Sequence, residues 1–218
     1  MKPVTNFKER ALAVMFPVRC PYCGRVIYVD DYACRDCKKK LPQTVYPRFA
    51  VGGFPCVSPF LYSGAYADAV KRFKFAKMIG YARTLSVPVV RAVKERFPGE
   101  AFDCVAFVPM HPKKLRRERF NHAEELAREC AALLGLPKVD LLEKFKNNKT
   151  QHTLKRSRRA KNVRGVFRVS DKSLVKGKNI LLIDDIITTG NTLGECARLL
   201  KREGCRSLCC ATVCSTSV

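Results

Sequence analysis

The sequence predicts an α/β protein in which a mostly parallel sheet is flanked by helices and preceded by a small N-terminal module built on four cysteines. Three observations support this. Short apolar runs alternate with amphipathic segments, two Cys-x-x-Cys pairs lie near the N-terminus, and an apolar run from Ile180 ends in an acidic pair and a threonine-rich turn. Strands that alternate with helices form a parallel sheet covered on both faces. A chain of 218 residues holds one such domain and a small appendage.

The N-terminal cysteines have the spacing of a structural metal site. Cys20 and Cys23 form one pair, Cys34 and Cys37 form the other, and ten residues separate the pairs. Each pair presents two thiolates to one point, so two pairs complete a tetrahedral zinc-knuckle site, and Gly24 permits the tight turn after the first pair. A redox role is the alternative. Two pairs in a segment too short for its own core favour zinc with a structural, non-catalytic role.

Composition divides the chain into three parts. Residues 1–40 hold a short amphipathic helix at Ala11–Phe16 and the cysteine module. Residues 41–59 are rich in proline and glycine, which indicates a linker. Residues 60–218 form the α/β domain, and we expect the module to fold independently of it.

The elements of the main domain follow from apolar periodicity and from capping residues. We expect strands at residues 57–62, 102–108, 139–145, 166–169, from Ile180, and at 208–213. We expect helices at 65–75, 81–97, from an Asn121 cap to a stop at Gly135, and from Asn191 to a stop at Gly204. Ligands of such sheets bind beyond the carboxyl ends of the strands, where the loops after the second and fifth of these strands both emerge.

The run from Ile180 to Thr192, Ile-Leu-Leu-Ile-Asp-Asp-Ile-Ile-Thr-Thr-Gly-Asn-Thr, predicts a site for a phosphorylated sugar. The N–H groups of the turn and the helix N-terminus favour a phosphate, and the acidic pair can accept hydrogen bonds from ribose hydroxyls. Taken alone, the acidic pair also fits a helix cap or a metal ligand. The predicted site residues are Asp184, Asp185, Thr188, Thr189, Gly190, Asn191 and Thr192.

The chain carries 42 Lys and Arg against 19 Asp and Glu, a formal net charge of +23, which implies an anionic partner. One basic segment is the loop at residues 113–119, and a second, residues 144–168, has ten cations and no acidic residue. A solvated face, a pyrophosphate site and a nucleic-acid surface all remain open for these segments. The candidate residues for the two binding roles are His111, Lys113, Lys114, Arg116, Arg158 and Arg159.

Histidine and phenylalanine side chains near the basic segments have two interpretations each. His111 follows a strand, where it can donate a proton to a leaving group or serve as a loop or cap residue. Phe120, Phe145 and Phe167 can stack on single-stranded bases or belong to the core.

The sequence also bears on location. No run approaches the roughly 18 apolar residues of a membrane span. The apolar residues Ala11–Phe16 precede Pro17 and a cysteine pair rather than a cleavage site, so we expect neither a signal peptide nor membrane insertion. Eight of the twelve cysteines are scattered as small apolar residues, which favours a reducing, cytoplasmic location.

The layout as a whole resembles the ComF family, and the run from Ile180 resembles the phosphoribosyl-pyrophosphate (PRPP) motif of type I phosphoribosyltransferases. The segments that carry the resemblance are Phe16–Gly24, the second cysteine pair, Lys71–Phe75, Val108–Pro112, Phe120–Ala123 with Leu126-Ala127, and Lys149–Gln151 with Leu154, Arg158 and Asn162. The resemblance implies a type I phosphoribosyltransferase-like fold, PRPP binding with Mg²⁺, and a role with single-stranded DNA in natural competence. A competence helicase or an uptake-channel protein is an implied partner.

The sequence departs from the family pattern at one place. Where the family reads Arg-Gly-Phe-Asn-Gln, this chain has Glu118-Arg119-Phe120-Asn121-His122, so the family's arginine falls on Glu118 and its glycine on Arg119. We predict a PRPP-binding, phosphoribosyltransferase-like protein that also binds single-stranded DNA. An active phosphoribosyltransferase with an unidentified acceptor, and a non-catalytic PRPP-sensing adaptor, are the alternatives.

Overall fold

The computed structural model describes most of the chain, namely residues 17–28, 31–42, 46–50, 52–75, 80–146 and 165–216. The expected helix at Ala11–Phe16 lies outside these residues. So does the middle of the second basic segment, including Lys149, Arg158 and Arg159.

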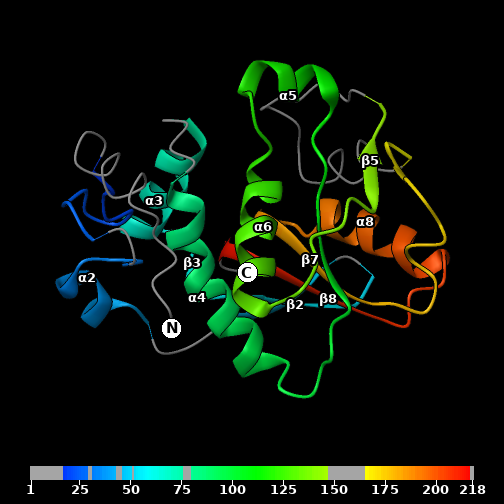
Figure 1. The fold of residues 1–218 in the computed structure, drawn as a ribbon, viewed down its shortest axis with the longest axis horizontal. Helices are drawn as coiled ribbons and strands as arrows, with labels where there is room; N and C mark the ends of the chain where they lie inside the picture. Colours follow the sequence, from blue (N-terminus) through cyan, green and yellow to red (C-terminus); the bar gives the residue numbers. More distant parts are fainter. Residues whose placement is uncertain are drawn as a thin grey trace.

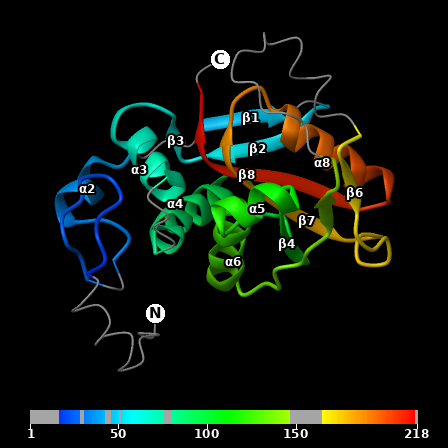
Figure 2. The same ribbon diagram turned by 90° about the horizontal axis from the view of Figure 1, so that it is seen from above.

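A mostly parallel sheet forms the centre of the molecule (Figures 1 and 2). Its strands, in spatial order, are β1 (Tyr46–Ala50), β2 (Phe54–Ser58), β8 (Ser207–Ser215), β7 (Asn179–Ile187) and β4 (Cys104–Phe107), and β3 (Phe60–Leu61) also pairs with β8. Only the β1–β2 pair is antiparallel in this sheet. The apolar run Ile180–Ile183 is at most 1% exposed, because β7 lies between two neighbours and under helices on both faces.

Helices cover both faces of the sheet, as expected. The helices among the described residues are α2 (Arg35–Lys40), α3 (Gly64–Phe75), α4 (Tyr81–Arg96), α5 (Pro112–Glu118), α6 (His122–Leu134) and α8 (Asn191–Arg202). Figure 2 shows α4 and α6 against one face and α8 against the other. The predicted caps of α6 are confirmed: Asn121 accepts a hydrogen bond from the Ala123 N–H, and Gly135 ends the helix at φ 70°. No helix among the described residues has the length and apolar character that crossing a bilayer requires.

The prediction of a linker at residues 41–59 is wrong. Strands β1 and β2 form a hairpin there, which continues the sheet and turns at Gly52 and Gly53 with φ values of 101° and 84°. Proline and glycine are typical of edge strands and hairpin turns as well as of linkers, so composition did not separate the two. Pro59 also divides the single strand expected at 57–62 into β2 and β3.

The first basic segment has more structure than expected, and the strands predicted at the ends of the second are present. The first is helix α5, which Figure 1 shows beyond the end of α6. The strands expected at 139–145 and 166–169 are β5 (Leu142–Lys144) and β6 (Phe167–Val169), which pair with each other in a small antiparallel sheet. The two described ends of the second basic segment therefore lie next to each other, with Lys144 paired to Phe167.

The cysteine module packs against the main domain and does not stand apart from it. Tyr22 is 5% exposed and lies edge-on to Phe60 and Tyr66, with ring centroids 5.8 and 5.7 Å away. Cys20 and Leu41 are buried in the same core cluster as the sheet. A segment of this size buries little apolar surface by itself, so it is packed against β3 and α3.

Candidate functional site

The carboxyl end of β4 lies beside the middle of β7, just before the acidic pair, and β7 continues to Ile187. Their register pairs Phe107 with Ile183, and the Val108 N–H donates to the Ile183 carbonyl at 3.0 Å. The chain therefore leaves β4 next to the acidic pair of β7. Any group bound at the acidic pair is within reach of the segment that begins at Pro109.

The threonine-rich turn forms a pocket with the first turn of α8. Its lining consists of Asp184 and residues 186–193. Gly190 has φ 73°, a conformation that costs a residue with a Cβ about 1–2 kcal/mol. Asn191 begins α8, so the unpaired N–H groups of a twelve-residue helix point toward the pocket. A small anion fits this arrangement.

The structure separates the two members of the acidic pair. Asp184 lines the pocket, and its Oδ1 accepts a hydrogen bond from the Asp185 N–H at 2.8 Å. Burial and the neighbouring Asp185 raise the pKa of Asp184 to about 7, although Lys74 and Lys114 act in the opposite direction. Asp185 is not among the residues that line the pocket, and its Oδ2 instead lies 2.7 Å from Lys74 Nζ.

Sequence reasoning missed the role of Lys74. Burial disfavours the charge of this lysine, but Asp185 and Asp184 outweigh that effect and raise its pKa. His122, to which we assigned no function, donates from Nε2 to the Lys74 carbonyl at 3.2 Å and holds the end of α3 against α6. A signal was available, because Lys74 belongs to one of the segments that carry the family resemblance, 71–75.

His111 is the N-cap of α5. Its Nδ1 accepts a hydrogen bond from the Lys113 N–H at 3.2 Å, so the cap interpretation is confirmed. Lys113, Lys114 and Arg116 are exposed on this helix. Lys114 is near enough to the acidic pair to lower the pKa of Asp184, which connects α5 electrostatically to the pocket.

The departure from the family pattern lies at the end of α5. Arg119 has φ 72° and is the only non-glycine residue with positive φ among the described residues. It occupies the C-cap position, where glycine is the usual residue. Glu118 makes an ion pair with Arg117 at 3.0 Å. The glycine of the family pattern is thus explained by backbone conformation, and Arg119 adopts it at an energetic cost.

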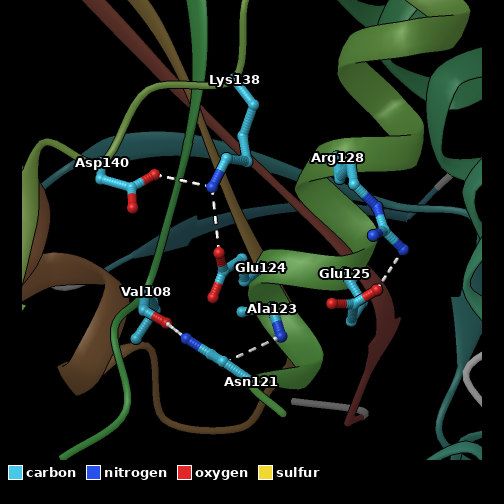
Figure 3. A network of polar contacts seen from close by, with 8 residues as sticks. All are labelled: Val108, Asn121, Ala123, Glu124, Glu125, Arg128, Lys138 and Asp140. Atoms are coloured by element: carbon cyan, nitrogen blue, oxygen red, sulfur yellow. Dashed lines mark hydrogen bonds and ion pairs between the residues drawn. The ribbon is translucent and has the colours of Figure 1, made fainter.

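Asn121 connects β4 to α6, as Figure 3 shows. Its Nδ2 donates to the Val108 carbonyl at 3.0 Å, while its Oδ1 caps the helix. In the same view Lys138 bridges Glu124 and Asp140 at 3.0 and 2.7 Å. These bonds fix the start of α6 relative to the end of β4.

Of the three phenylalanines near the basic segments, two belong to the core. Phe120 and Phe167 are 8% and 4% exposed. Phe145 is 41% exposed, and Lys146 and Arg168 lie 5.4 and 5.5 Å from its ring centroid. An exposed ring between two cations is suited to stacking on a base.

The four expected cysteine ligands converge. Their Sγ atoms all lie within 4.8 Å of one another. Zinc–thiolate bonds of about 2.3 Å place the sulfurs of a tetrahedral site about 3.8 Å apart. The Cys23 and Cys34 sulfurs are 3.6 Å apart, and the Cys37 N–H donates to Cys34 Sγ. This donor set fits a tetrahedral metal ion, and its four ligands leave no open position for catalysis.

The comparisons with known proteins agree with this geometry. A family model described as "Phosphoribosyl transferase domain" matches residues 121–217. "Competence protein F" of Haemophilus influenzae is 25% identical over 190 residues, covering 85% of this chain and 79% of that protein. The chain belongs to the ComF family. Two further relatives are "Competence protein ComFC" of Bacillus subtilis and "DNA utilization protein YhgH" of Salmonella typhimurium. The first is 28% identical and the alignment covers 85% of this chain and 72% of that protein. The second is 27% identical, with 90% of this chain and 84% of that protein covered.

These matches confirm the family and the type I phosphoribosyltransferase-like fold. The matched domain begins at Asn121 and contains the pocket. The cysteine module and α3 precede the matched domain, so Lys74 reaches the ComF-family pocket from outside that domain.

Proposed function

We propose that this ComF-family protein binds PRPP in the pocket at the start of α8. The 5′-phosphate is held by the N–H groups and hydroxyls of residues 188–192, and the ribose hydroxyls by Asp184 and Asp185. The single observation that supports this most directly is the meeting of a helix N-terminus, a left-handed Gly190 and an acidic side chain in one pocket. Lys113 and Lys114 on α5 supply positive charge for the pyrophosphate.

The pocket's donor set suits the Mg²⁺ that accompanies PRPP. Asp184 would offer carboxylate oxygens, which Mg²⁺ prefers, and the pyrophosphate would supply most of the other ligands of the ion. When bound, Mg²⁺ neutralises charge on the leaving group. Zinc is the proposed metal of the four-cysteine module, since soft thiolates and tetrahedral geometry favour it.

We also propose that the basic segments bind single-stranded DNA in the cytoplasm during natural competence. The net charge of +23 exceeds what one small anion requires, and Phe145 offers an exposed ring between two cations. The names of the relatives, two competence proteins and a DNA utilization protein, favour this partner. A competence helicase or uptake-channel protein is the proposed protein partner.

Calorimetric titration with PRPP and Mg²⁺ tests the pocket. Replacing both Asp184 and Asp185 with asparagine should abolish binding, because both proposed acceptors of the ribose hydroxyls lose their charge. Asp171→Asn, an exposed site outside the pocket, is the matched control and should bind normally. Unchanged PRPP affinity in the double variant would overturn the site assignment.

Pyrophosphate release separates an enzyme from a sensor. The protein is incubated with PRPP and Mg²⁺ against a panel of bases, nucleosides and single-stranded DNA. Release that depends on one acceptor identifies a phosphoribosyltransferase and its substrate. Tight PRPP binding without release identifies a non-catalytic, PRPP-sensing adaptor, since the same fold supports both outcomes.

Salt dependence tests DNA binding. The logarithm of affinity should fall with the logarithm of salt concentration at about −0.7 per phosphate neutralised. Phe145→Ala should weaken binding of single strands by about 1–3 kcal/mol if the ring stacks on a base. Phe49→Ala, which truncates a ring that is 65% exposed on β1, should have no effect. A flat salt response would reject the proposal.

A further inference from the structure

Helix α3 contacts both the cysteine module and the acidic pair. At one position, Arg72 Nη1 donates to the Pro21 carbonyl, between the first two cysteines, at 2.8 Å. Two residues later, Lys74 Nζ lies 2.7 Å from Asp185 Oδ2. The last turn of α3 therefore connects the metal module directly to the acidic pair beside the pocket.

The Lys74–Asp185 pair is sheltered from solvent. The two side chains are 25% and 17% exposed, and this is the only ion pair of the acidic residues 184 and 185 among the described residues. Partly buried pairs hold their geometry better than exposed ones, because water screens the attraction less. The pair uses Asp185 Oδ2, so Oδ1 is available to accept a ligand hydroxyl.

Without Lys74, Asp185 would lose its ion pair and still face the like charge of Asp184. Two carboxylates on successive residues repel each other, and the pKa of Asp184 already reflects this. An unpaired Asp185 would then turn toward solvent and away from the pocket edge. Lys74 prevents this by fixing one oxygen.

Both ends of α3 are held in place. At the C-terminal end, Phe73 is fully buried against Phe120 and His122, and His122 binds the Lys74 carbonyl. At the other end the Tyr66 ring stacks on Phe60 at 4.3 Å. The Tyr66 hydroxyl also donates to the Lys40 carbonyl at 3.2 Å, so the cysteine module holds the helix from outside the sheet.

We propose that Lys74 is a positioning residue that presents Asp185 to the ribose hydroxyls, and that the metal-loaded cysteine module sets this position by fixing α3. The inference rests on the proposed PRPP site and adds to it a route by which the metal module controls PRPP affinity. Loss of the metal loosens Tyr22 and Pro21, frees the start of α3, and moves Lys74 away from Asp185.

The first test is PRPP–Mg²⁺ titration of the full, zinc-loaded chain. Lys74→Met should weaken binding by about tenfold or more, and Lys74→Arg should restore part of it, since coupling between contacting groups has this size. Lys71→Met, which removes an exposed lysine from the same helix, should bind like the unaltered protein. Equal affinity of Lys74→Met and the unaltered protein would overturn the inference.

The second test measures the coupling. Tyr22→Ala, or removal of zinc by a chelator, should weaken PRPP binding about fivefold or more in the unaltered chain but not in the Lys74→Met background. Tyr22→Phe is the control, because the Tyr22 hydroxyl is buried without a hydrogen-bond partner among the described residues. If Tyr22→Ala does not fold, Arg72→Gln replaces it. This variant removes the hydrogen bond to the Pro21 carbonyl without making a core cavity, and it should weaken PRPP binding in the same way.

The outcomes are distinct. Equal losses in both backgrounds would show that the module acts without Lys74 and would overturn the coupling. Absence of PRPP binding by the unaltered protein would overturn the proposed function and this inference with it. Binding that is lost in the Asp184→Asn, Asp185→Asn double variant but unaffected by Lys74→Met would overturn this inference alone.

Discussion

Replacing Asp184 with asparagine should stabilise the ligand-free protein above neutral pH, although it removes part of the proposed PRPP site. Burial and Asp185 raise the pKa of Asp184 from 3.8 to about 7. A group whose pKa is higher in the folded state than in the unfolded state contributes stability below the unfolded pKa and loses it as pH rises through the folded value. The charged Asp184 is therefore a cost to folding, which asparagine removes while its Oδ1 still accepts from the Asp185 N–H.

The size of the stabilisation by Asp184→Asn follows from the shift in the pKa of Asp184. At about 1.36 kcal/mol per pKa unit, the shift of about three units amounts to about 4 kcal/mol when fully expressed. Solvent at the pocket mouth reduces this to about 2 kcal/mol. For a chain of this length, about 2–4 °C of melting temperature corresponds to each kcal/mol, so Asp184→Asn should melt about 4–8 °C higher at about pH 8.

Thermal denaturation without PRPP and Mg²⁺ measures this difference across pH. The stabilisation should be largest near pH 8, shrink as the pH falls from about 7 toward 3.8, and vanish only below that value, where Asp184 is neutral in both the folded and the unfolded chain. Asp171→Asn is a control of opposite sign: hydrogen bonds from Ser173 lower the pKa of Asp171, so this variant should lose stability at high pH and recover as pH falls. Stabilisation by Asp184→Asn that does not change with pH would refute the electrostatic account.

Three further changes test the supports of the site. Arg119→Gly should raise the free energy of unfolding by about 1–2 kcal/mol in urea, because glycine adopts the left-handed C-cap without strain; a decrease would show that the arginine side chain contributes more than the strain costs. Asn121→Ala should lower it by about 1–2 kcal/mol, and Asn121→Asp, which keeps the cap but not the donor to Val108, should lie between. Zinc removal should lower the melting temperature of the whole domain in one transition, since Tyr22 packs against Phe60; a domain that melts at an unchanged temperature would contradict this.

Local sequence patterns predicted the parts of this protein that depend on neighbouring residues. The apolar run of β7, the glycine turn at Gly190 and the Asn121 cap are each specified within a few residues. The four cysteines were predictable for the same reason, because two short turns carry all four ligands.

The features that sequence reasoning missed depend on partners far along the chain. Lys74 meets Asp185 across 111 positions, and no periodicity encodes that contact. The β1–β2 hairpin contains the prolines and glycines of a linker and is distinguished only by its pairing with β8. The left-handed conformation of Arg119 was also missed. It follows from the way α5 must end before Asn121 starts the next helix, and the arginine itself gives no sign of it.

The ends of the second basic segment lie close to the proposed PRPP pocket, so the two ligands should influence each other. Burial and Lys114 lower the pKa of Lys144 while Asp184 raises it, and the Gly165 N–H donates to Glu195 Oε1 on α8 at 3.1 Å. PRPP places negative charge beside these cations, and we expect it to weaken binding of single-stranded DNA by at least about fivefold. Fluorescence anisotropy of a labelled strand, with and without saturating PRPP–Mg²⁺, measures the change. Because linkage is reciprocal, DNA must weaken PRPP binding by the same factor. Independent binding of the two ligands would contradict this expectation and would mean that the DNA surface lies away from the PRPP pocket.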